Sequence, residues 1–136
     1  MADLSIRARN KVYSDMDFAF RENPVSGDVS IKKDVEAVKQ SVLNILLTNR
    51  GEKPFEPSFG SGIRSYLFEQ IDAVTETLIR EDIIFSLGNF EPRVVVEDVT
   101  VSAVPDSNYV DISLTVNIIN PINITTSIEF TVERLR

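Results

Sequence analysis

Up to about residue 90, the hydrophobic positions recur every three or four residues, which is the period of helices with a buried face. Asp34 is a suitable N-cap for a first helix, and Gly51 is expected to end it. The apolar face of this helix consists of Val35, Val38, Val42, Ile45 and Leu46. A short second helix is expected from about Ile63 to Glu69. Asp72 is expected to cap a third, longer helix that ends at Gly88.

The third helix is unusual because it carries apolar residues on two sides. One side holds Val74, Leu78 and Phe85, and the other holds Ile79, Ile83 and Leu87. A surface helix of a small domain needs only one such stripe. The sequence therefore leaves two alternatives: the helix is sandwiched inside its own fold, or another chain buries the second stripe.

After residue 93 the period changes to two, which is typical of half-buried strands. Apolar and polar residues alternate over 99–103, 110–118 and 127–133, and turn-forming residues stand between these segments at 105–108 and 120–123. Three such strands in succession predict an antiparallel meander with one face against the helices. Helices followed by strands predict an α+β fold, a two-layer domain with helices packed on one face of a small antiparallel sheet.

The length of 136 residues suits one domain, which we expect to span the whole chain. We expect an extended leader at 1–28, a mainly helical part at 29–90 and the β-meander at 94–134. The leader either lies over the core, held by Phe18 and Phe20, or reaches a neighbouring protein as an arm.

Composition excludes several classes of function. The chain has no Cys and no His, which removes thiolate metal sites, the usual zinc sites and His-based catalytic triads. A net charge of −7 disfavours nucleic acid as a partner, because neutralising phosphates requires a basic face. No apolar run is long enough to span a membrane, and the N-terminus lacks the pattern of a signal peptide. We therefore expect no cofactor, no nucleic acid and no membrane among the partners.

Two pairs of carboxylates deserve testing as a glycosidase site, which needs two acids across a cleft and one raised pKa. The pairs are Glu52 with Glu56 and Glu69 with Asp72. All four lie in polar, turn-forming surroundings where a carboxylate stays solvated and ionised, so we expect no catalysis. The glycines around Ser61, at 60 and 62, also suggest a phosphate cradle, but no Walker lysine follows them and a tight corner explains them better.

The tripeptide Glu91-Pro92-Arg93 follows the third helix. Pro92 holds Glu91 in an extended conformation, so the acid and the guanidinium are expected to project from a stiff loop. They are either solvated charges on a connector or anchors for a partner.

The last predicted strand, from about Thr125 to Glu133, ends near the C-terminus, so little chain remains to cover its outer edge. The residues of this candidate edge are Thr125, Ser127, Glu129, Thr131 and Glu133. Its charged members, with Arg134, either prevent edge pairing or border an edge that receives a strand from a partner.

The connector after the first helix is rich in Pro and Gly. Pro54 and Pro57 each push the residue before them out of helical geometry, so Phe55 and Phe59 are presented on an extended loop. We expect both rings to pack into the core. Such a connector has no catalytic signature, but it fixes the angle between two helices.

This connector, as part of Leu46–Glu69, resembles the signature of the baseplate-wedge and sheath-initiator proteins of contractile phage tails, a family with members described as lysozyme-like. Tyr13–Asp17, Glu91–Arg93 and the closing strands match in order and spacing, so the resemblance covers most of the chain. It is closer to the phage members than to the secretion-type contractile injection systems, which are the alternative.

The resemblance implies a structural component of the virion tail baseplate, assembled in the host cytoplasm, and not an enzyme. A lysozyme-like tail enzyme that cleaves peptidoglycan is the alternative. Glu91, Pro92 and Arg93 would contact the helical core bundle of the wedge, and the sheet edge would template the first sheath ring by β-strand addition. The implied partners are other baseplate wedge proteins and the tail sheath protein, with tail tube or hub proteins as further candidates.

Overall fold

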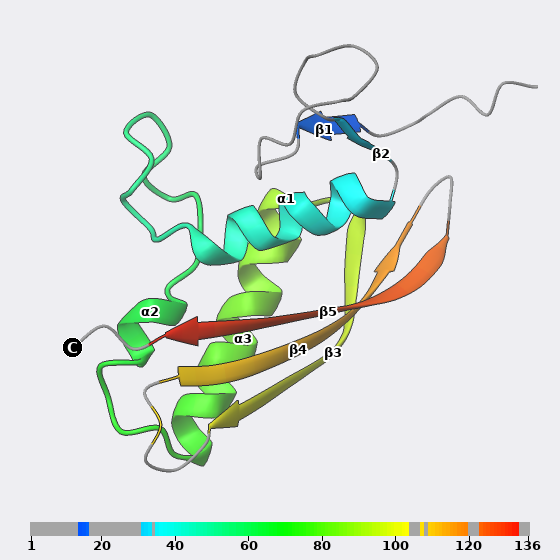
Figure 1. The fold of residues 1–136 in the computed structure, drawn as a ribbon. Coiled ribbons are helices and arrows are strands. Elements are labelled where there is room, and N and C mark those ends of the chain that lie inside the picture. Colours follow the sequence, from blue (N-terminus) through cyan, green and yellow to red (C-terminus); the bar gives the residue numbers. More distant parts are fainter. Residues whose placement is uncertain are drawn as a thin grey trace, which may run out of the picture.

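Three helices and five strands follow one another in the computed structural model, which describes residues 14–16, 31–33, 35–103, 107, 109–119 and 123–133 (Figure 1). The described elements are β1 (Ser14–Met16), β2 (Ile31–Lys33), α1 (Val35–Leu47), α2 (Ile63–Tyr66), α3 (Ala73–Phe90), β3 (Val94–Ala103), β4 (Tyr109–Ile118) and β5 (Ile124–Glu133).

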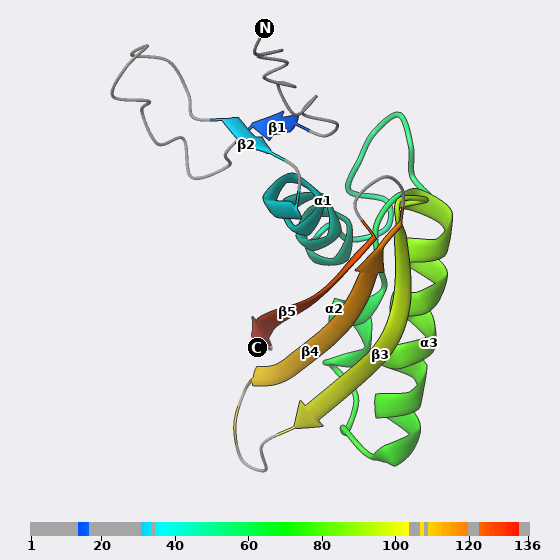
Figure 2. The same cartoon turned by 90° about the vertical axis from the view of Figure 1, so that its right-hand side faces the viewer.

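The three long strands form an antiparallel meander in the order β3-β4-β5. Strands β4 and β5 pair without interruption, from Tyr109 opposite Glu133 to Ile118 opposite Ile124. The pairing of β3 with β4 has one irregularity, between Val96 and Asp98. Alternate residues of β4 are buried, as the period of two requires. The fold is therefore the two-layer α+β arrangement that the sequence predicts, and Figure 2 shows the curved three-stranded sheet with α3 running along it beside β3.

One hydrophobic core joins all three helices to the inner face of the sheet. The helices contribute the residues of their buried stripes, and each strand contributes its inward residues. The fully enclosed members include Val38 and Val42 of α1, Ile63 of α2, Ile79, Ile83 and Leu87 of α3, and Leu114, Val116 and Ile118 of β4. This shared core sets the angle between α1 and α3.

Three predicted helix ends are wrong by a few residues. Helix α2 ends at Tyr66 and not at Glu69. Helix α1 ends at Leu47 and not at Gly51, because the next backbone groups pair with Ser61: the Thr48 carbonyl accepts the Ser61 N–H (2.9 Å) and the Arg50 N–H donates to the Ser61 carbonyl (3.3 Å). Gly51, with φ +86°, serves a turn inside the connector instead. Helix α3 continues past Gly88 to Phe90, whose ring packs on Phe59, and Pro92 then prevents any extension.

The start of α3 is confirmed. The carboxylate of Asp72 accepts hydrogen bonds from the backbone N–H groups of Val74 (3.0 Å) and Thr75 (2.9 Å). The corresponding expectation for α1 concerns Asp34, which lies outside the described residues.

The two stripes of α3 have different fates. Ile79, Ile83 and Leu87 are completely buried, whereas Val74 is 66% and Phe85 62% exposed. The helix is therefore not sandwiched inside the described part of its own fold. Its second stripe faces outward.

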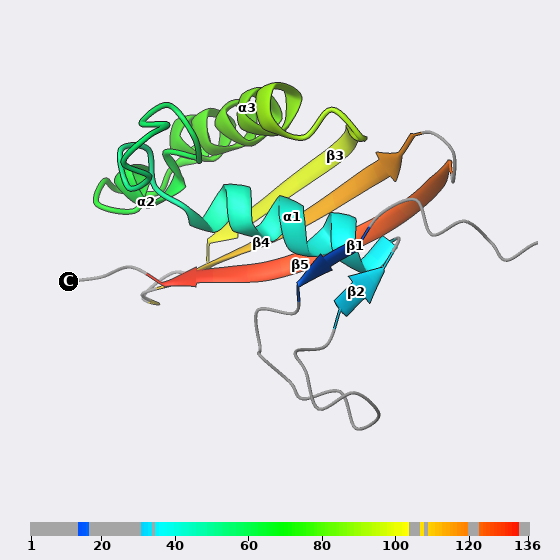
Figure 3. The ribbon, with the colours of Figure 1, turned by 90° about the horizontal axis from the view of Figure 1, so that it is seen from above.

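A small antiparallel ribbon of β1 and β2 lies on the α1 side of the molecule and was not predicted from the sequence. It pairs Ser14 with Lys33 and Met16 with Ile31. Figure 3 shows this ribbon and α3 at opposite sides, with α1 between them. The expectations for Phe18, Phe20 and Arg134 fall outside the described residues.

No helix within the described ranges is long and apolar enough to cross a membrane.

Candidate partner-binding sites and the corner that positions them

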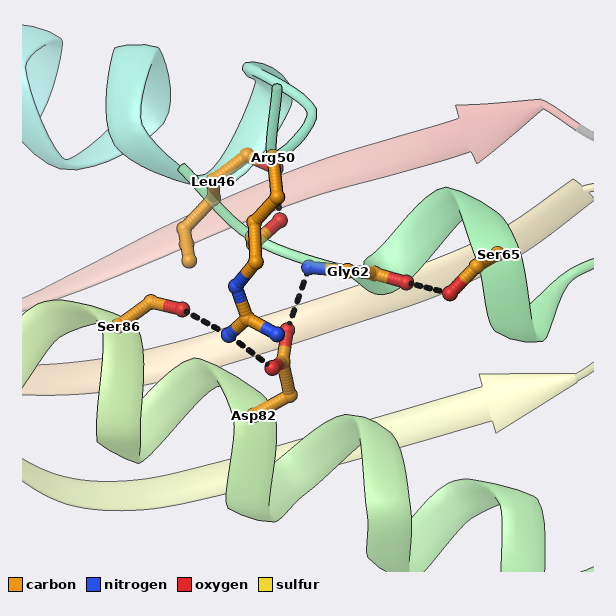
Figure 4. A network of polar contacts seen from close by, with 7 residues as sticks. Leu46, Arg50, Gly62, Ser65, Asp82 and Ser86 are labelled. Atoms are coloured by element: carbon orange, nitrogen blue, oxygen red, sulfur yellow. Dashed lines mark hydrogen bonds and ion pairs between the residues drawn. The ribbon is translucent and has the colours of Figure 1, made fainter. Parts of the chain in front are cut away.

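An ion pair with a buried carboxylate and a partly exposed guanidinium joins the connector to α3 (Figure 4). The guanidinium of Arg50 binds the carboxylate of Asp82 and donates to the hydroxyl of Ser86 at 3.3 Å. The other oxygen of Asp82 accepts the backbone N–H of Gly62 at 2.7 Å. The Asp82 side chain is only 6% exposed, so these partners satisfy a charge that water hardly reaches.

The glycine before Ser61 allows two backbone segments to pack closely. Gly60 has φ +104°, and a Cβ there would lie 2.3 Å from the carbonyl oxygen of Thr48. The N–H of Ser61 donates to that same carbonyl at 2.9 Å, and the Ser61 hydroxyl donates to the carbonyl of Leu46 at 2.6 Å. Because protein acceptors already engage the N–H groups of Ser61 and Gly62, this turn does not offer them to a phosphate.

The two connector phenylalanines behave differently, and one expectation is wrong. Phe59 packs beside Phe90 with 5.2 Å between ring centroids, and the ammonium of Lys53 lies 4.5 Å above its ring. Phe55 is 96% exposed instead of packing into the core. The loop closes through the Gly51 N–H and the Pro57 carbonyl (2.8 Å), which leaves residue 55 at an outer turn.

Glu91 and Arg93 do not both project into solvent. Arg93 donates to both carboxylate oxygens of Glu91 (2.5 and 2.7 Å), and the Ser41 hydroxyl on α1 donates to the second oxygen (2.5 Å). Glu91 is 2% exposed, whereas the Arg93 side chain is 31% exposed. The Glu91 carboxylate therefore points inward and is hydrogen-bonded to α1, and only the guanidinium side of the pair reaches the surface.

The ion pair also determines the protonation of Glu91. Burial acts to raise the pKa of Glu91, but the hydrogen bonds from Arg93 and Ser41 outweigh it and hold the pKa below its ordinary value of 4.5. The ionised pair therefore stabilises the fold at neutral pH, and this contribution disappears as the pH falls through the lowered pKa.

The candidate edge residues lie on β5, which is the last strand of the described sheet and pairs with β4 alone. Their side chains are exposed on the face opposite the helices: Thr125, Ser127, Glu129, Thr131 and Glu133. Within the described ranges, nothing pairs with the outer backbone of this strand. A hollow of about 220 Å³ between α1 and β5 runs beside it, and it is lined by Glu36, Lys39, Gln40, Leu43, Ser127, Ile128 and Glu129.

The candidate acids for catalysis either form hydrogen bonds or ion pairs within the fold or are exposed to solvent. Glu52 accepts the N–H of Asn49 at 2.9 Å, and Glu56 pairs with Lys53 on the surface. The backbone N–H of Thr75 is the main cause that holds the pKa of Asp72 below its ordinary value of 3.8, opposite to what a general acid requires. Among the described residues, no three acidic side chains gather where they would hold a metal ion.

Sequence reasoning missed Asp82, Ser86 and Ser41. The available signal was their position, because Asp82 and Ser86 fall beside the buried stripe of α3 where apolar residues are expected. An acid in that position needs a cation, and Arg50 lies 32 residues earlier in the chain.

These features define the class of the protein: a small α+β domain in which ion pairs join the helices to the loops, with β5 at the edge of its sheet. The chain belongs to the family of the baseplate wedge protein gp25, whose sequence profile matches residues 32–121. It is 32% identical over 96 residues to the baseplate wedge protein gp25 of Enterobacteria phage T4, which covers 71% of this chain and 70% of that protein. The family resemblance seen in the sequence is confirmed, and with it a place in the baseplate of a phage tail or tail-like particle.

Solved structures agree with this fold. A protein of Geobacter sulfurreducens named as a candidate tail lysozyme superposes with a TM-score of 0.66 at 27% identity, covering 74% of this chain and 91% of that one. A chain of the anti-feeding prophage baseplate gives 0.62 at 23% identity, covering 91% and 87%. A chain of the postcontracted pyocin R2 baseplate gives 0.55 at 22% identity, covering 90% and 99%. The last two support the fold alone.

Proposed function

We propose that this chain is a non-enzymatic part of a contractile-tail baseplate wedge that docks on the helical core bundle and templates the first sheath ring by β-strand addition. Family membership supports the baseplate role. The observation that carries the templating step is β5, whose outer backbone has no partner among the described residues. Unpaired N–H and C=O groups in a row are the chemical requirement for adding a strand.

The surroundings of β5 fit an added strand. Alternate side chains of such a strand point to opposite faces of the sheet. Those on one face would meet the polar row from Thr125 to Glu133, and those on the other would enter the hollow beside Leu43 and Ile128. Because most residues that line this hollow are polar or charged, we expect the incoming sheath strand to place there a side chain with a polar or charged end.

A single added strand gives modest affinity, because ordering a flexible arm offsets much of the hydrogen bonding. Several copies arranged around a tail tube would raise the effective concentration of edges for a sheath subunit that is already held. Templating thus needs a rigid connector between the helices as well as the open edge of β5, since every copy must present β5 at the same angle.

A proline at an outward-facing N–H of β5 is expected to abolish sheath attachment and leave wedge assembly intact. Thr125→Pro and Thr126→Pro change adjacent residues outside the hydrophobic core, one with its N–H outward and one with its N–H toward β4. A proline whose lost N–H pointed toward β4 lowers the thermal unfolding temperature of the purified chain, because it removes a hydrogen bond of the sheet. The variant that keeps the unfolding temperature therefore has its proline at the outward N–H. Electron microscopy of particles made with that variant should show baseplates without sheath. Normal contractile tails would refute the strand-addition step.

Docking through the Glu91–Arg93 pair is proposed to use the surface side of the Arg93 guanidinium. Arg93→Ala is expected to reduce incorporation into wedges and to cost about 2–3 kcal/mol of unfolding free energy, because the Glu91 carboxylate remains buried without its cation.

The double variant Glu91→Gln/Arg93→Ala is the matched control for this effect. It removes the buried charge and should recover most of the unfolding free energy while incorporation, measured by co-purification with wedge proteins, stays low. If incorporation returns together with stability, Arg93 acts only within the fold and the docking role is wrong.

A peptidoglycan-cleaving enzyme is the rival function, favoured by the name of the Geobacter neighbour. It lacks support from the carboxylates, since Glu52, Glu56 and Glu69 are exposed and Asp72 caps a helix. A homologous component of a secretion-type injection system is the other alternative, and it would use the same surfaces.

A further inference from the structure

The outward side of α3 carries an apolar seam that neither the Glu91–Arg93 pair nor β5 uses. It consists of Val74, Leu78, Glu81, Phe85 and Gly88, at spacings of four, three, four and three residues. Val74, Leu78 and Phe85 are 66%, 37% and 62% exposed. This spacing is the seven-residue repeat by which one helix packs along another.

The seam lies in a position that other chains can reach. Figure 3 shows α3 along one side of the molecule, with β1 and β2 at the opposite side beyond α1. From Val74 to Gly88 the seam runs for about 21 Å at the usual rise of a helix. Ile84, 48% exposed, adds apolar surface on its flank.

The aromatic residue of the seam, Phe85, already has a cationic neighbour within its own chain, which restricts its ring in part. The guanidinium of Arg50 lies 5.8 Å from the centroid of the Phe85 ring, and Asp82 and Ser86 fix that guanidinium in turn. A preorganised aromatic side chain loses little conformational freedom on binding, so it suits the centre of an interface.

We propose that this seam binds an amphipathic α-helix of another baseplate protein. The partner helix carries a Lys or Arg opposite Glu81, the one charged residue of the seam. It also places a bulky apolar side chain over Gly88, where a built Cβ meets nothing within 4 Å and leaves a notch. A strand fits less well, because α3 offers it no unpaired backbone and the seam does not have a period of two.

Charge argues against a second copy of this chain as the partner. Pairing two seams antiparallel about their middle brings Glu81 against Glu81, and pairing them parallel in register does the same. Two carboxylates enclosed in one interface repel each other, and each copy adds a net charge of −7. A basic residue at this point removes the penalty.

Site-specific photo-crosslinking in assembled particles tests the partner directly. A benzoylphenylalanine at Val74 or Phe85 is expected to form adducts on one helical segment of another baseplate protein, at sites about eleven residues apart. The same residue at Glu69, exposed but outside the seam, should give no adduct on that helix. Adducts on a second copy, on the N-terminal part of the same chain or on a strand, or no adducts at all, would overturn the proposal.

A charge reversal provides the second test. Glu81→Lys is expected to reduce incorporation into baseplates by about tenfold or more while the purified chain keeps its thermal unfolding temperature. Glu69→Lys makes the same change of charge away from the seam and should incorporate normally. An acid introduced at the crosslinked basic residue of the partner should rescue Glu81→Lys. Normal incorporation of Glu81→Lys contradicts the seam but leaves the β5 and Arg93 proposals untouched, since their variants lie elsewhere.

Discussion

Gly60→Ala should lower the unfolding free energy by about 3 kcal/mol or more, one of the largest effects expected of any single substitution in this chain. The added Cβ would lie 2.3 Å from the Thr48 carbonyl oxygen, a backbone atom that cannot turn aside. That carbonyl also accepts the N–H of Ser61, so moving it breaks the bridge that closes the corner. The backbone conformation, with φ +104°, adds its own cost for any residue with a side chain.

Gly51→Ala is the matched control, because it has the same change and also a positive φ (+86°), but its Cβ meets nothing within 4 Å. It should cost about 1–2 kcal/mol, the penalty of the left-handed conformation alone. Urea unfolding of both variants gives the difference, which isolates the contact with Thr48. Equal losses would mean that close packing at the corner is not what requires glycine.

Arg50→Met is the second substitution with a large expected effect, about 3 kcal/mol. It leaves the Asp82 carboxylate buried with the N–H of Gly62 as its remaining neighbour. The value falls at the lower end for a buried pair because the Arg50 side chain is itself 39% exposed. The substitution also removes the cation above Phe85.

Arg64→Met serves as its control, since Arg64 is an exposed arginine on the adjoining α2 and should change stability by less than about 0.5 kcal/mol. Adding Asp82→Asn to Arg50→Met should recover part of the loss, because the charge left without its cation is then gone. If Arg50→Met unfolds at the same urea concentration as the natural chain, the pair does not hold the connector to α3.

The parts of this fold that follow from local chemistry were predictable. Alternation over 110–118 fixes the buried face of β4, since shifting it by one residue would expose every apolar side chain. Asp72 caps α3 because its own carboxylate reaches the next N–H groups in the sequence. Neither result depends on what the rest of the chain does.

The parts that depend on distant residues were not predictable. The exposure of Phe55 depends on how the Pro54–Pro57 loop closes on Gly51. The inward turn of Glu91 depends on Ser41, fifty residues earlier. Local sequence drew attention to Glu91 and Arg93 as candidate anchors but could not show that each is the other's partner.

The continuation of α3 past Gly88 shows the same limit. Glycine favours a helix end, but the contact of Phe90 with Phe59 and the pairing of Glu91 with Arg93 stabilise the extra turn. Tertiary contacts outweigh a propensity of about 1 kcal/mol. At Gly88, the missing side chain instead leaves open space on the outward face of the helix.

The central proposal is that β5 receives a strand of the sheath protein, and a high-resolution cryo-electron microscopy structure of the assembled baseplate with its first sheath ring tests it most directly. We expect a sheath segment hydrogen-bonded along the outer backbone of β5, with one of its side chains in the hollow between α1 and β5. An outer edge of β5 that is covered by this chain's own residues, or that faces no sheath strand, would contradict it.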